Sequence, residues 1–163
     1  MHVIAGKAVA FGEALKTPYI QYCEQIVKNA QILAETLLNL GYDIVSGGTD
    51  THLVLIDLTQ KEISGKKAEI ALETAGITTN KNMVPFDERS PMVTSGIRIG
   101  TPALTTRGFK ENEMVKVANL IDNVIHNIQD ETIIKNTRNS VSELCAQFPI
   151  YEDFAIDEMP QLS

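Results

Sequence analysis

Residues 41–58, GYDIVSGGTDTHLVLIDL, contain two short apolar segments separated by a glycine-rich turn. Tyr42 to Val45 is typical of a short β-strand, and the run from His52 to Leu58 is typical of a second one. The residues between them, 46–50, are serine, glycine, threonine and aspartate, which are common in turns. The stretch therefore predicts a β-hairpin or a close relative of one.

Helical patterns surround this hairpin. Apolar residues recur at intervals of three and four, the periodicity of amphipathic helices, over residues 17–41, 110–129 and 131–147. Thr17 and Pro18 form a helix start signal, with threonine as the cap. The remaining expected elements are a helix over 65–75 capped by Ser64, an extended piece from Ile77, a polar loop over 80–95, a strand over 96–100 and a turn-rich stretch over 101–108. This order predicts an α+β fold, a short and mainly antiparallel sheet with helices on one face.

Composition narrows the function classes. The chain has 163 residues, of which 44% are apolar, and a formal net charge of −7. That charge argues against a general nucleic-acid binder, which needs a basic face for phosphates. No apolar run is long enough for a transmembrane helix, and the start lacks the pattern of a signal peptide. Cys23 and Cys145 are expected to be buried small apolar residues, and the histidines are too scattered for a zinc site.

The first predicted helix, residues 2–15, is apolar on most of its surface. Such a helix belongs inside a large domain, and no element precedes it, so we expect the chain to be the tail end of a longer protein. The helix over 17–41 is expected to connect to the missing part, since about 22 helical residues span roughly 33 Å.

Arg98 is the strongest candidate for a ligand-binding residue. It lies in a short strand between Ile97 and Ile99, so alternation places it on the face opposite the two isoleucines. A guanidinium fixed there suits the two-pronged binding of a carboxylate or phosphate, and the flanking glycines would let a ligand approach the backbone. The alternative is a structural ion pair with a nearby carboxylate such as Asp57.

Two other polar stretches are candidates for ligand binding. Residues 78–82, TTNKN, offer amides and hydroxyls that could bind a polar heterocycle, or they form a solvated loop. Residues 46–49, SGGT, are interpreted as a hairpin turn rather than a phosphate-binding loop, because no helix follows them. The sequence shows no Ser-His-Asp arrangement and no desolvated lysine nucleophile.

Three motifs in order resemble one enzyme family. They are MHVIAGKAVAFGEAL (1–15), GYDIVSGGTDTHLVLIDL (41–58) and GITTNKNMVPFDERSPMVTSGIRIGTPALTTRGF (76–109). Together they resemble serine hydroxymethyltransferase, in its bacterial form, over residues 1 to about 151. The resemblance implies a fold-type-I, pyridoxal-phosphate-dependent enzyme that interconverts serine plus tetrahydrofolate and glycine plus 5,10-methylenetetrahydrofolate. It also implies a cytoplasmic homodimer that contacts neither membrane nor nucleic acid.

The resemblance also assigns roles to individual residues. Arg98 corresponds to the residue that binds the α-carboxylate of the amino-acid substrate. Asn82 corresponds to the family's folate-contacting asparagine. Ser90, Pro91 and Met92 correspond to its Ser-Pro-Phe folate segment, where Met92 replaces the aromatic side chain by a methionine.

The resemblance implies four parts of the chain: a remnant helix of the large cofactor domain (1–16), a connecting helix (17–41), the C-terminal small domain (42–151) and an acidic tail expected to be mobile (152–163). The family's cofactor-binding lysine would lie upstream of residue 1. We therefore expect no catalytic residue in this chain, no bound pyridoxal phosphate and no activity when it is alone. The alternatives are a non-catalytic remnant or binding module, and a free-standing protein whose first helix docks a partner.

Overall fold

The computed structural model describes residues 1–150, and the predicted acidic tail at 152–163 lies outside the described residues. The helices are His2–Ala14 (α1), Thr17–Asn39 (α2), Gly65–Thr74 (α3), Pro102–Thr106 (α4), Glu111–His126 (α5) and Glu131–Ala146 (α6). The strands are Asp43–Ile44 (β1), Leu53–Asp57 (β2), Asn80–Asn82 (β3) and Gly96–Gly100 (β4), and two 3-10 turns lie at Val45–Gly47 (η1) and Thr59–Lys61 (η2). The predicted α+β class is confirmed.

The strands form one antiparallel sheet in the order β1-β2-β4-β3. The predicted hairpin is present, with Ile44 opposite Ile56. Strand β4 lies in the middle of the sheet, because Ile97 is opposite both Ile56 of β2 and Lys81 of β3. Residues that are distant in sequence, from 53–57 and from 80–82, therefore flank the Arg98 strand on its two sides.

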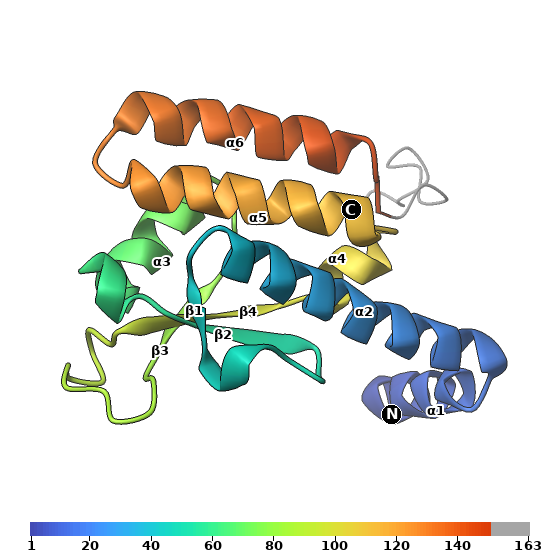
Figure 1. The fold of residues 1–163 in the computed structure, drawn as a ribbon. Helices are drawn as coiled ribbons and strands as arrows, with labels where there is room; N and C mark the ends of the chain where they lie inside the picture. The colour runs from blue at the N-terminus through green and yellow to red at the C-terminus, as the bar shows by residue number, and fades with distance from the viewer. Residues whose placement is uncertain (151–163) are drawn as a thin grey trace.

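The core lies between the sheet and the helices. Val54 and Ile56 of β2 and Ile97 of β4 are fully buried and belong to the same core cluster as apolar residues of α2, α3 and α5. Burial of one such side chain contributes about 1.5–3 kcal/mol. Figure 1 shows α2, α3 and α5 over one face of the sheet and α6 outside α5, so the other face is left free of these helices.

Helix α1 contributes no buried residue, and its large apolar side chains are exposed, for example Phe11 at 69%. In Figure 1 it lies at the far end of α2, away from the sheet. Helix α2 is long, as predicted, and Gly41 follows it with φ of 79°, a conformation that glycine adopts without strain. The expected helix start at residue 17 differs in detail, since Lys16 occupies the cap position without a side-chain hydrogen bond.

Two local predictions were wrong. The polar segment Asn80–Asn82 was expected to be loop but forms strand β3, because it pairs with β4 and is tied to α3 by Glu69, which accepts a hydrogen bond from the backbone N–H of Lys81 (3.0 Å). The stretch expected to be rich in turns contains the helix α4, which Thr101 precedes and Pro102 begins. Proline is well tolerated in the first helical turn.

Candidate functional site on the open face of the sheet

Arg98 lies on the face of the sheet that the helices leave free. It is exposed, whereas its neighbours Ile97 and Ile99 are buried. The register places it directly between Leu55 of β2 and Asn80 of β3, and side chains opposite one another in an antiparallel pair share a face. Arg98 is therefore flanked on this face by two uncharged side chains, Leu55 and Asn80.

The guanidinium of Arg98 has no partner among residues 1–150, since neither a salt bridge nor a side-chain hydrogen bond involves it there. Asp57, the carboxylate considered as its structural partner, instead accepts a hydrogen bond from the backbone N–H of Thr59 at 2.8 Å. The ion pair between Arg98 and Asp57 is thus not present. This part of the chain leaves the donors of Arg98 available to a ligand.

Asn80 and Asn82 share the open face with Arg98, because Asn80 is opposite Arg98 and Asn82 is opposite Gly96. The amide of Asn82 donates to the carbonyl of Met83 at 2.7 Å. Strand β3 is held at the edge by Glu69 of α3, which accepts from the backbone of Lys81 and pairs with its Nζ at 3.3 Å. The asparagines therefore sit on a fixed strand rather than on a free loop.

The two strands are joined by residues 83–95, here named the β3–β4 loop. The Asp87 carboxylate binds its beginning, middle and end: it accepts from the backbone N–H of Val84 (3.3 Å), of Arg89 (3.0 Å) and of Ser95 (2.8 Å) and from the Ser95 hydroxyl (2.6 Å). Burial alone raises the pKa of Asp87, but these hydrogen bonds outweigh it and lower the pKa to about 2. Asp87 is thus a stable anion at neutral pH.

The β3–β4 loop is also fastened to α3. The backbone N–H groups of Gly65 and Lys66 donate to the carbonyls of Thr94 (3.0 Å) and Val93 (2.9 Å), and the guanidinium of Arg89 donates to the carbonyl of Ile63 (2.7 Å). A side chain at Gly65 would lie 2.2 Å from the carbonyl oxygen of Gly96. Helix and loop therefore meet in backbone contact.

Gly96 was expected to let a ligand approach the backbone, but it is closely packed instead. A Cβ at this position would lie 2.6 Å from Cγ1 of Val84 and 2.7 Å from the carbonyl oxygen of Ile56. The space beside Gly96 is therefore filled by the β3–β4 loop, and it is not an approach path for a ligand. Gly100, on the other side of Arg98, has its nearest neighbour, a methyl of Leu53, at 3.3 Å.

Ser90, Pro91 and Met92 lie exposed in the same loop, with Met92 exposed at 73%. The Ser90 carbonyl accepts from the backbone N–H groups of Val93 and Thr94, both at 2.9 Å, which closes a tight turn. The fold therefore brings Asn80, Asn82 and Arg98 together on one face, and places Ser90–Met92 in the connection between their two strands.

Comparison with known proteins gives the family. A family model described as serine hydroxymethyltransferase matches residues 1–121. A serine hydroxymethyltransferase from Dichelobacter nodosus is 58% identical over 151 residues, which is 93% of this chain and 36% of that protein. The chain belongs to the serine hydroxymethyltransferase family. It spans about a third of the length of this relative and corresponds to its C-terminal part.

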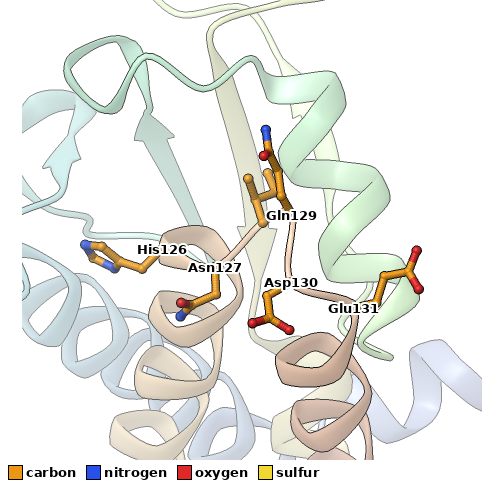
Figure 2. A pocket seen from close by; sticks show the side chains of 6 residues that line it. His126, Asn127, Gln129, Asp130 and Glu131 are labelled. Carbon is orange, nitrogen blue, oxygen red and sulfur yellow. The ribbon is translucent and has the colours of Figure 1, made fainter.

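The structure has hollows away from this face. A depression of about 510 Å³ lies at the turn between α5 and α6. Figure 2 shows the side chains of residues 126–131 that line it. Asp130 in this turn caps α6, since its carboxylate accepts from the backbone N–H groups of Thr132 and Ile133. An apolar cavity of about 260 Å³ lies between β4, α4, α5 and α6. Neither hollow is lined by Arg98, Asn82 or Ser90–Met92.

Residues 1–150 contain no cluster of three histidine, cysteine or acidic side chains that could hold a metal ion. None of the helices in this range is long and apolar enough to cross a membrane.

Asp87 and Glu69, which hold the site without belonging to its exposed surface, were not predicted from the sequence. A local signal existed for Asp87, because aspartate shortly after Pro85 favours a turn in which its carboxylate binds nearby backbone N–H groups. Nothing local pointed to Ser95, eight residues further on, as its main partner.

Proposed function

We propose that this chain provides the amino-acid-binding and folate-binding part of a serine hydroxymethyltransferase, an enzyme that interconverts serine plus tetrahydrofolate and glycine plus 5,10-methylenetetrahydrofolate. The observation that carries the proposal is the unpaired guanidinium of Arg98 on the open face of the sheet. An arginine held on a central strand, with no internal carboxylate, is suited to bind the carboxylate of an amino acid through two parallel hydrogen bonds.

Asn82 and the exposed segment Ser90–Met92 form the folate side in this proposal. The amide of Asn82 is a donor and an acceptor that can bind the polar edge of a pterin ring. Met92 offers an exposed, flexible thioether in place of an aromatic ring, so its contact with a flat ligand is apolar and adaptable. Asn82 and Arg98 lie on adjacent strands. This supports a single site that binds folate on one side and the amino acid on the other.

Pyridoxal phosphate supplies, in this family, the electron sink for the bond that is broken at the amino acid. The lysines within residues 1–150 do not fit the cofactor-binding lysine: none is buried, and Lys81 is paired with Glu69, whereas that amine needs a desolvated pocket. We therefore assign no step through the cofactor to these residues. The chain alone is proposed to form no stoichiometric, borohydride-reducible adduct with pyridoxal phosphate, and mass spectrometry after reduction tests this.

The complete enzyme is proposed to be a cytoplasmic homodimer, as the family implies, with serine, glycine and tetrahydrofolate as its ligands. The net charge of −7 supports small-molecule ligands over nucleic acid as partners.

A chimera tests the proposal. Residues 1–150 of this chain replace the homologous segment of the Dichelobacter nodosus enzyme, and glycine binding is followed through the absorbance of the cofactor. Arg98→Lys keeps the charge but loses the planar fork, and it should weaken glycine binding roughly ten- to hundred-fold, as expected for a lost charge-assisted contact of about 1.5–3 kcal/mol.

The matched control is Arg138→Lys, because the guanidinium of Arg138 is exposed and donates only to the carbonyl of Thr74 at 2.9 Å. Circular dichroism should show both variants folded and loaded with cofactor. Glycine titration of Arg98→Lys that matches the parent chimera would contradict the assignment of Arg98.

A further inference from the structure

The hydrogen bonds of the β3–β4 loop converge on one side chain. The Asp87 carboxylate accepts from residues 84, 89 and 95, so a single group joins the first, middle and last parts of a thirteen-residue connection. Hydrogen bonds to an ionised acceptor are about twice as strong as neutral ones. The loop is therefore closed on itself by Asp87.

The loop also contains backbone strain that these bonds must hold. Phe86 has φ of 60° and its side chain is fully exposed, and Thr94 has φ of 57°. Residues other than glycine are uncommon in this region of backbone space, because the Cβ atom is crowded there. Asp87 binds the backbone on both sides of Phe86, at Val84 and Arg89, where it can stabilise the strained tip.

Both ends of the network lead directly into the proposed site. Val84, which Asp87 holds at 3.3 Å, packs against Gly96 and follows Asn82 by two residues. Ser95, which Asp87 holds through two bonds, precedes Gly96, and its carbonyl accepts a hydrogen bond from the backbone N–H of Leu58 (2.9 Å), which follows β2. A change at Asp87 is thus transmitted to the strand of Asn82 and to the strand of Arg98.

We propose that Asp87 is a positioning residue of this site: through its hydrogen bonds to Val84, Arg89 and Ser95 it fixes the folate-side residues relative to Arg98. The inference rests on the proposed function for the identity of the two ligand halves. The physical principle is that binding groups need a supporting shell whose own geometry is locked.

Asp87→Asn is the decisive variant, because it keeps the size of the side chain and changes only its bonding. Both oxygens of Asp87 accept from donors, whereas the amide of asparagine has one acceptor oxygen and one NH₂ donor. In either orientation the NH₂ group faces a backbone N–H. The variant should therefore open the loop locally without removing any apolar packing.

The experiment uses the full 163-residue chain, labelled with ¹⁵N, without ligand. Amide hydrogen exchange within residues 84–95 is expected to rise about tenfold or more in Asp87→Asn, while the slowest amides of β2 and α5 keep their rates. The resonances of the Asn82 side-chain amide and of Nε–H of Arg98 are expected to shift, which a purely structural role of Asp87 would not require.

Asp130→Ala is the matched control, since it also removes two carboxylate hydrogen bonds to backbone N–H groups, at the start of α6 and outside the loop network. It should not accelerate exchange within 84–95. If Asp87→Asn does not fold, Ser95→Ala, which removes only the 2.6 Å hydroxyl bond, should give the same pattern with a smaller, several-fold acceleration.

Unchanged exchange within 84–95 would overturn the proposal, and so would faster exchange with Asn82 and Arg98 resonances identical to the parent. Both readouts are made without substrate, so this failure would leave the assignment of Arg98 standing. A failure of Arg98→Lys in the chimera would in turn leave the loop result standing.

Discussion

Gly96→Ala should strongly destabilise the fold, although it adds only one methyl group. Gly96 lies where the sheet, the β3–β4 loop and α3 meet. The new Cβ would lie 2.6 Å from Cγ1 of Val84, 2.7 Å from the carbonyl oxygen of Ile56 and 3.1 Å from that of Asn82. Ordinary contacts of a Cβ begin near 3.4 Å, so at least two neighbours must move by most of an ångström.

The magnitude follows from which neighbours must move. Val84 can rotate, but Ile56 and Asn82 present backbone carbonyls on the two strands that flank β4. Overpacking of a well-packed interior costs about 1–3 kcal/mol, and displacement of paired strands places Gly96→Ala at the upper end, about 3 kcal/mol. Because a domain has about 5–15 kcal/mol of stability in total, the variant should still fold.

Gly100→Ala is the matched control in the same strand. Its Cβ would meet a methyl of Leu53 at 3.3 Å and a ring carbon of Pro102 at 3.6 Å, and the leucine can give way. The loss of unfolded-state entropy on replacing glycine by alanine stabilises a protein by about 0.4–1 kcal/mol where the conformation allows it. We expect a net change of roughly zero, within about 1 kcal/mol.

The assay is urea unfolding of the full chain, followed by circular dichroism of the helices. Gly96→Ala should lower the midpoint with an unchanged dependence of the unfolding free energy on urea, since both states expose the same surface. Equal midpoints for Gly96→Ala and Gly100→Ala would refute the reasoning, because the close approach at Gly96 would then have no energetic consequence.

Two further predictions concern pH and the buried polar contact behind the site. The pKa of Asp87 is lowered in the folded chain from 3.8 to about 2, so the stability that its ionised form contributes is present above pH 4 and is lost as the pH falls toward 2. In urea titrations at several pH values, the difference in unfolding free energy between the parent and Asp87→Asn should therefore shrink over that range. Asn29 of α2 is fully buried, and its side-chain amide donates to the Thr105 hydroxyl and to the carbonyl of Phe109, both at 2.9 Å. Asn29→Ala should therefore lower the free energy of unfolding by about 1–3 kcal/mol in thermal or urea unfolding, whereas the exposed control Asn119→Ala should lower it by under about 0.5 kcal/mol. Equal losses would show that burial does not decide the effect.

The helices and the central strand were predictable because their signals are local. Periodicity located α2, α5 and α6 to within a few residues, and Ser64 caps α3 as predicted, accepting a hydrogen bond from the backbone N–H of Lys67. The alternation Ile97-Arg98-Ile99 assigned the correct face to each of the three side chains.

Strand β3 was not predictable from local signals, and helix α4 carries only one, the start signal Thr101-Pro102. Asn80-Lys81-Asn82 has low intrinsic strand propensity, and it becomes a strand through pairing with β4 and through the bonds from Glu69, twelve residues away. The position of α4 depends on Asn29, which lies 76 residues before its partner Thr105. Both elements depend on contacts with other elements of the fold, which local propensity does not encode.

For Arg98, the sequence pattern and the three-dimensional structure give different amounts of information about function. Alternation placed its side chain on the open face, but the sequence left two partners possible, a ligand or Asp57. The structure excludes Asp57, which is opposite Gly96 and whose carboxylate accepts from the backbone N–H of Thr59. Lys81, the other cation of the β3–β4 pair, has its own carboxylate in Glu69. On these two strands Lys81 is therefore paired with a carboxylate of the fold, whereas Arg98 is exposed. Because no group within residues 1–150 occupies the guanidinium of Arg98, its paired donors remain available to an incoming carboxylate, as the role proposed for it requires.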